Sequence, residues 1–299
     1  MVRRGVTAEG AGSNETLGTI RGDSGRVTEL RDEEKVVAAT ITTTLGLRVE
    51  QHDDGRQPGL HDLNIISVDG SPGAVEVTAA ADPDSIQLWK LVNGRGEQRT
   101  VKDLQGGWML TLEPTARAKR LRIELPAFLG ELESQGVTEI PSQRRRLEVP
   151  ESIEGRARTL GIVSGNQSGT NFPGSIYFTI EQPHERTSGV VDSTGNAVPG
   201  WVRDFLLDPD QSDVLGKLAR SGASERHAFI LVPGLTSAPF GVVDMLGRDE
   251  DDVVPTAAPD LPGQVTHIWL MAFRTKGSGL RWSPDSGWER FERQFHLED

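Results

Sequence analysis

The sequence predicts an α/β protein in which helices flank a central sheet and a β-rich extension follows toward the C-terminus. Segments with helical or strand periodicity follow one another through the first half as helix, three strands, helix, strand and helix. Two apolar runs, at 63–68 and 74–77, flank a turn rich in Gly and Pro, a pattern typical of two adjacent strands. Further apolar runs at 228–232 and 267–273 indicate buried strands in the second half.

Composition places the chain among ordinary globular proteins. Its 299 residues suffice for one large domain or two small ones, and 35% are hydrophobic and 25% charged. There is no uninterrupted run of 18 apolar residues, so we expect no membrane span. The net charge of -12 argues against general polyanion binding. The absence of cysteine excludes disulfides and thiolate metal sites, and it fits a cytoplasmic location.

The first half is expected to contain a disordered tail and then an α/β core. Residues 1–26 lack periodicity, whereas an apolar stripe with helical spacing predicts a helix over 29–45 that ends at Gly46. In addition to the central pair, strands are expected at 47–51 and 108–112, and a helix is expected to begin near Pro83. A helix over 115–134 contains Pro126, which is expected to kink or split it.

The second half is expected to extend the first sheet or to form a small second lobe. Residues 138–156 resemble a linker, 160–163 and 175–180 are predicted to form a hairpin, and 201–220 is predicted to be partly helical. His227 precedes a strand and is interpreted as a structural residue, and the acidic segment 244–262 as a solvated loop. The predicted division is therefore a tail at 1–26, a core at 27–137 and a C-terminal part at 138–299.

Two acidic side chains fall within the central strand pair. Side chains alternate between the faces of a strand, so Asp62 lies opposite in direction to Leu63, and Glu76 opposite to Val75 and Val77. An antiparallel pair in this register would bring Asp62 and Glu76 together. Two carboxylates in apolar surroundings are costly unless a cation lies between them, so the pattern favours a divalent metal site.

In order and spacing, residues 29–135 resemble the PD-(D/E)xK, or restriction-endonuclease-like, nuclease superfamily. Its members carry a helix with an acidic residue, a strand, a strand with an Asp, a strand with Glu-x-Lys and a helix. The matching positions are Glu34 (or Glu33) on the first helix, His61-Asp62, and Glu76-Val77-Thr78. The resemblance implies a mixed central sheet and a metal-dependent nuclease active in defence or repair, with Mg²⁺ or Mn²⁺ held by Asp62 and Glu76 and, through water, by Glu34.

The sequence departs from this motif where Thr78 occupies the position of the lysine. In some members of the superfamily the lysine migrates to the following helix, and Lys90 is the residue that the sequence offers for this role. The resemblance assigns Lys90 to orienting the nucleophile or neutralising the transition state. Basic clusters at 117–122 and 144–146 are candidates for contacting nucleic acid, although solvated helix and linker residues explain them equally well.

Two other interpretations stay open at the level of sequence. The acidic net charge and the missing lysine favour a catalytically degenerate relative that serves as a binding or scaffolding module, as a homodimer or with a protein partner. Alternatively, the chain is an α/β domain with an unrelated small-molecule site. The acidic pair, which has no packing value, favours the nuclease.

Overall fold

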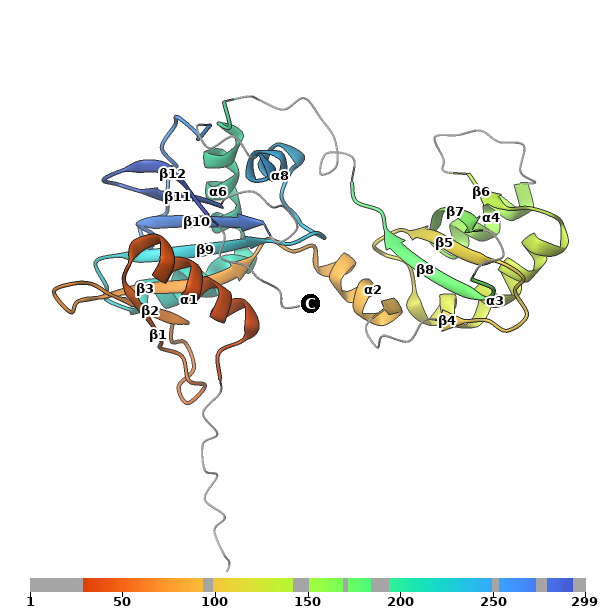
Figure 1. Ribbon diagram of the computed structural model, residues 1–299, viewed down its shortest axis with the longest axis horizontal. Helices are drawn as coiled ribbons and strands as arrows, with labels where there is room; N and C mark the ends of the chain where they lie inside the picture. The colour runs from red at the N-terminus through yellow and green to blue at the C-terminus, as the bar shows by residue number, and fades with distance from the viewer. Residues whose placement is uncertain are drawn as a thin grey trace, which may run out of the picture.

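The protein folds around two mixed β-sheets, each flanked by helices (Figure 1). The structure is a computed structural model, and it describes residues 29–93, 99–141, 151–168, 172–183, 194–248, 253–272 and 279–292. The predicted α/β class is confirmed. The expected tail at 1–26 lies outside the described residues, as do 144–146 and 249–252.

The first sheet has seven strands in the order β1-β2-β3-β9-β10-β11-β12. A meander of β1 (Arg48–Gln51), β2 (Leu63–Ile66) and β3 (Pro72–Ala79) is antiparallel. β9 (Arg226–Val232) lies parallel to β3, and β10 (His267–Ala272) lies parallel to β9. The antiparallel hairpin of β11 (Gly279–Ser283) and β12 (Gly287–Phe291) completes the sheet.

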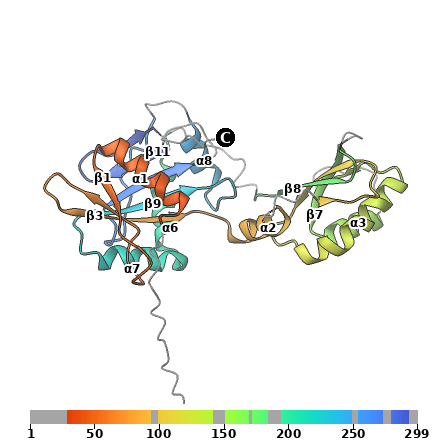
Figure 2. The same ribbon diagram turned by 60° about the horizontal axis from the view of Figure 1, so that its bottom comes forward.

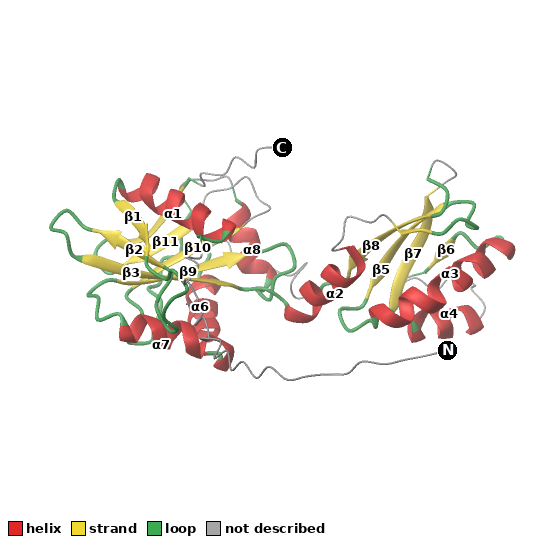
Figure 3. Cartoon of the chain, turned by 90° about the horizontal axis from the view of Figure 1, so that it is seen from below, coloured by secondary structure: helices red, strands yellow, loops and turns green. Residues whose placement is uncertain are grey.

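Helices cover both faces of this sheet, as Figures 2 and 3 show from two sides. α1 (Asp32–Leu45) buries Val37 and Ile41 against one face, where the aromatic side chains of Phe229 and Trp269 are also buried. α6 (Ala197–Leu207), α7 (Ser212–Arg220) and α8 (Phe240–Gly247) pack on the opposite face, and the short helix η1 (Pro209–Gln211) joins α6 to α7. Gly46, with φ of 66°, ends α1 as the sequence predicts.

The second sheet has the strand order β4-β8-β5-β7-β6 and its own apolar core. Its strands are β4 (Arg99–Thr100), β5 (Gly107–Leu112), β6 (Glu139–Ile140), β7 (Ile162–Ser168) and β8 (Ser175–Ile180). α2 (Pro83–Asn93), α3 (Ala118–Ser134) and α4 (Glu151–Thr159) accompany it, and side chains of all three contribute to its core. Pro126 lies inside α3, which continues through it as one helix.

The division of the chain differs from the expected boundary near residue 137. The second sheet, with its helices, is built from residues 83–180, and it is inserted between β3 and the helices that return to the first sheet. The core predicted at 27–137 therefore contains parts of two sheets, and β9 to β12 extend the first one. Pairing between distant strands decides this arrangement, and local periodicity does not reveal it.

Two segments also differ locally from the expectation. β7 and β8 do not form a hairpin, because β5 lies between them, antiparallel to β7 and parallel to β8. Helices α4 and α8 occupy parts of the segments that were predicted as a linker and a solvated loop. In both cases apolar side chains, Ile153 in α4 and Leu246 in α8, are buried in a core. None of the described helices combines the length and the apolarity needed to cross a membrane.

Candidate functional site

The register of β2 and β3 places Asp62 opposite Glu76. Leu63 pairs with Val75 and Asn64 with Ala74. In the same register Asp62, the residue before β2, lies opposite Glu76 of β3. Residues directly opposite in an antiparallel pair project from the same face. Both carboxylates are buried, with 5% and 3% of their residues' surfaces exposed.

Asp62 is held by the backbone of β3. The Val77 N–H donates a hydrogen bond to Asp62 Oδ2 over 2.8 Å, and the Arg31 guanidinium lies 3.6 Å from Oδ1. Burial raises the pKa of Asp62 even though the hydrogen bond from Val77 and the charges of Lys217 and Arg31 favour the carboxylate. The backbone hydrogen bond fixes the direction of this carboxylate toward β3.

Glu76 is the most perturbed acid of the site. Burial and the nearby charge of Asp62 raise its pKa to about 8, although Lys217 opposes the shift. Lys217 Nζ donates to Glu76 Oε1 over 2.8 Å, whereas Oε2 is buried and forms no hydrogen bond. A buried carboxylate oxygen without a partner carries a large desolvation cost, which a further cation would relieve.

Lys217 places a positive charge next to Glu76. It lies on α7, 17% of its side chain is exposed, and Asp213 Oδ2 is a second anion at 3.5 Å. Burial lowers its pKa, but the hydrogen bond to Glu76 and the surrounding acids outweigh burial, and the net shift is upward. The nuclease motif does not point to this residue. The available signal was its spacing of three from Val214, which places Lys217 near the buried side of the helix.

A cavity of about 250 Å³ opens beside these residues. Its lining includes Glu34 and Arg31 from the start of α1, together with Asp62 and Lys217. Glu34 is buried and its carboxylate accepts a hydrogen bond from the Arg31 backbone N–H over 2.8 Å, which closes the capping box of α1. Three acids and two cations thus meet at one end of β2 and β3.

The structure brings only part of the predicted site together. Asp62, Glu76 and Glu34 share this region, but their ligand atoms do not form a group of three within 4.8 Å of one another. Thr78 Oγ1 donates instead to Gln211 Oε1 of η1 over 2.9 Å. Lys90 is exposed on α2 and does not line the cavity.

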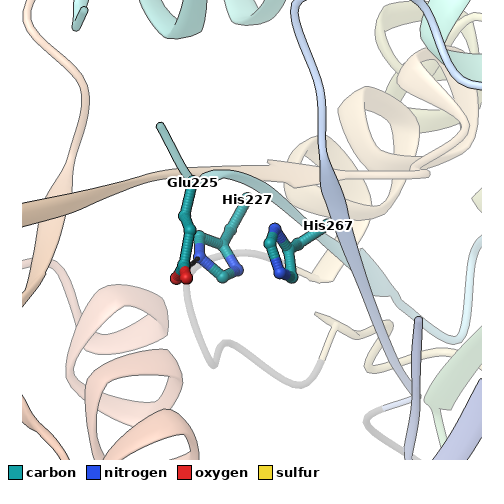
Figure 4. A group of neighbouring side chains, drawn as sticks. All are labelled: Glu225, His227 and His267. Carbon is teal, nitrogen blue, oxygen red and sulfur yellow. Dashed lines mark ion pairs between the residues drawn. The ribbon is translucent and has the colours of Figure 1, made fainter. Parts of the chain in front are cut away.

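Among the described residues, a different group has the spacing of a metal site. Glu225, His227 and His267 place one ligand atom each within 4.8 Å of one another, so this group could hold a metal ion (Figure 4). His227 is the second residue of β9, not a residue before the strand. The basic residues at 117–122 are exposed around the start of α3, in the unit formed by the second sheet and its helices (the second unit). One of them, Arg120, pairs with Glu124.

Comparison of this chain with family models, curated proteins and solved structures finds no significant match.

Proposed function

We propose that the protein is a divergent PD-(D/E)xK nuclease that hydrolyses phosphodiester bonds of nucleic acid with Mg²⁺ or Mn²⁺, and that Lys217 replaces the motif lysine. The observation that carries the proposal is the contact between Lys217 Nζ and Glu76 Oε1, next to Asp62. The order of helix α1, antiparallel strands β1 to β3 and a later helix supports a restriction-endonuclease-like core around the first sheet.

The position of the lysine fits a migrated motif. α7 follows β3 along the chain, separated from it by the inserted second sheet, and it packs against β3. In the motif, the lysine stands two residues after the glutamate and lies beside its carboxylate. Lys217 on α7 lies beside the carboxylate of Glu76 in the same way. Thr78, which stands at that motif position, is turned to Gln211.

The donor set fits a hard divalent cation. Asp62 and Glu76 offer carboxylate oxygens, which Mg²⁺ and Mn²⁺ prefer, and Glu76 Oε2 is buried without a hydrogen bond. Two buried acids with raised pKa values gain most from a positive charge between them. Glu34 completes the set at the rim, where its present partner Arg31 has a side chain 62% exposed and therefore free to turn away.

Each side chain has a distinct part in this chemistry. A bound divalent cation supplies Lewis-acid stabilisation of the scissile phosphate and lowers the pKa of the attacking water. Asp62, directed by the Val77 N–H, and Glu76 fix the position of the cation. The Lys217 ammonium orients the nucleophile and offsets negative charge that develops on the phosphate.

The alternative is a binding or scaffolding module that has lost catalysis. It was favoured by the missing motif lysine, and the contact of Lys217 with Glu76 weakens that argument. The acidic net charge of -12 remains in its favour. The two functions differ in one measurable respect, since both allow metal binding but only the nuclease cleaves a substrate.

The test combines calorimetric titration of Mg²⁺ and Mn²⁺ with cleavage of plasmid and single-stranded oligonucleotides. We expect wild type to bind metal and cleave, Asp62→Asn and Glu76→Gln to lose metal binding, and Lys217→Met to lose at least about 100-fold in cleavage rate. Lys35→Met, an exposed lysine paired with Asp32 on α1, is the matched control and retains wild-type rates.

Three results would count against the proposal. Absence of metal binding by wild type, or equal binding by wild type and the two acid variants, contradicts the metal site. Metal binding without cleavage of either substrate would indicate the non-catalytic binding or scaffolding module instead. Loss of cleavage in Lys90→Met with full activity in Lys217→Met returns the catalytic lysine to α2.

A further inference from the structure

A second cluster of ligand-type side chains lies where β9 and β10 begin. His227 pairs in register with His267 across the parallel strands β9 and β10, and Glu225 precedes β9. His227 alternates with Ala228, which belongs to the core under α6 to α8, so the histidine projects toward the α1 face. Figure 4 shows the three side chains next to one another.

His227 carries a buried nitrogen without a partner. Only 2% of the residue is exposed, and Nε2 makes no hydrogen bond, with Glu225 Oε2 at 3.5 Å. Nδ1 accepts a hydrogen bond from the indole N–H of Trp269 over 3.3 Å, which leaves the ring proton on Nε2. A proton held in a buried position without an acceptor is unfavourable, and a metal ion at Nε2 would remove that cost.

The other two side chains are also prepared as ligands. His267 Nδ1 is hydrogen-bonded to Thr266 Oγ1 over 2.8 Å, and the two imidazole rings stack with centroids 4.2 Å apart. Burial and the neighbouring imidazole lower the pKa of His267 to about 4, and burial lowers that of His227, so both rings are neutral at pH 7. The nearby His227 ring, with Nε2 3.5 Å from Oε2, lowers the pKa of Glu225 and keeps its carboxylate ionised.

The surroundings provide room and balanced charge. A cavity of about 210 Å³ adjoins the cluster and is lined in part by Arg281 and Asp285. Arg281 is paired with Glu289 on β12, and its guanidinium lies 5.7 Å from the centre of a Trp269 ring. Because a carboxylate already neutralises this arginine, it opposes a bound cation less than a free guanidinium would.

We propose that Glu225, His227 and His267 form a transition-metal site of the zinc class, separate from the acid and lysine site. Two imidazoles and one carboxylate favour Zn²⁺ over Mg²⁺, because imidazole nitrogen is a borderline ligand that hard cations bind poorly. Three protein ligands leave the remaining coordination position to the cavity. The site joins the N-terminal ends of the two parallel strands at the centre of the sheet.

Metal binding has a structural consequence at Trp269. A metal ion on Nε2 of His227 transfers the ring proton to Nδ1, so the imidazole stays neutral and Nδ1 becomes a donor. The Trp269 N–H then loses its acceptor. The indole N–H signal of Trp269 in a ¹⁵N–¹H NMR spectrum therefore reports occupancy of this site, and Trp269→Phe assigns the signal.

The test uses Zn²⁺ alone as the probe with the full chain. We expect one Zn²⁺ per chain by calorimetry and metal analysis, a shift of the Trp269 indole signal, and a higher melting temperature that depends on Zn²⁺ concentration. Loss of an outer-shell partner alone weakens metal binding about 10- to 100-fold, so loss of a ligand in His267→Ala or Glu225→Gln is expected to weaken Zn²⁺ binding at least about 100-fold.

The controls separate this site from other histidines and from the acid pair. His52 and His61 also stack, with centroids 4.0 Å apart, and His52→Ala should retain wild-type Zn²⁺ affinity. Asp62→Asn should do the same, because that residue belongs to the other site. Absence of stoichiometric Zn²⁺ binding by wild type, or wild-type affinity in His267→Ala and Glu225→Gln, would overturn the proposal.

Discussion

Glu76 shows how a single buried carboxyl group ties function to stability. Its raised pKa means that the folded protein holds a proton between about pH 4.5 and about pH 8 that the unfolded chain releases. The contribution of Glu76 to the free energy of unfolding is therefore fully present below about pH 4.5 and is lost as the pH rises toward about 8. The metal-free protein is destabilised at the pH where its acid pair is ready to bind a cation.

This linkage can be measured by urea unfolding across pH 5 to 8. We expect wild type to lose stability over this window by several kcal/mol, and Glu76→Gln to lose less, because the substitution removes the titrating group. Asp62, whose pKa is also raised, contributes with the same sign in both proteins, so the difference between the two slopes isolates Glu76. Identical slopes would contradict the raised pKa.

The same group makes metal binding depend on pH. Mg²⁺ competes with the proton on Glu76, so its apparent affinity should rise about tenfold per pH unit between pH 6 and 8 and level off above. Calorimetric titrations at three pH values measure this directly. An affinity that stays flat over this range would show that Glu76 is already ionised without metal.

Thr78 occupies the position of the motif lysine in the sequence, but its side chain is bonded outside the proposed metal site. Its hydroxyl donates to Gln211, so Thr78→Val should cost about 1 kcal/mol of stability through the lost hydrogen bond. Cleavage activity, by contrast, should stay at the wild-type level. Chemical unfolding and the plasmid assay together check both parts, and a strong loss of activity with normal stability would place Thr78 back in the site.

At the level of elements, two glycines give opposite expectations for the same substitution. Gly279 of β11 faces Phe291 of β12, and a Cβ at this position would stand 2.0 Å from the phenyl ring. Phe291 is 4% exposed and packs against Trp269, so it has little room to move. Gly279→Ala should therefore destabilise the protein by about 1–3 kcal/mol.

Gly130 provides the matched control within α3. Apart from the neighbouring residues and the backbone of α3 itself, no atom lies within 4 Å of the Cβ that an alanine would place there. Glycine in a helix interior costs about 0.5–1 kcal/mol relative to alanine. Gly130→Ala should stabilise the protein by this amount. Thermal unfolding of both variants decides the point, and destabilisation by Gly130→Ala would contradict the packing around α3.

At the level of the whole molecule, the two sheets have separate apolar cores. Leu110 is fully buried in the core of the second sheet, whereas Asp62 and Lys217 belong to the first unit. Leu110→Ala should lower the stability of the second unit by about 2–5 kcal/mol without changing metal affinity. Calorimetry should show one transition moved and one retained. A common shift of the entire unfolding curve would mean that the units fold as one.

The sequence by itself determined the local features of this protein. The periodicity of 29–45 and the Gly at 46 specify α1, and the alternation in 63–68 and 74–77 specifies an antiparallel pair with Asp62 facing Glu76. These follow from short-range geometry, since helical spacing, strand alternation and turn chemistry are encoded within a few residues.

Only the tertiary structure decided which distant residues complete the sites. Lys217 lies 141 positions from Glu76 and reaches it because α7 packs against β3, after a whole second sheet has been inserted between them. His227 and His267 meet because β9 and β10 pair in parallel. Such pairings depend on how complete faces bury their apolar surfaces against one another, which no local window of sequence contains.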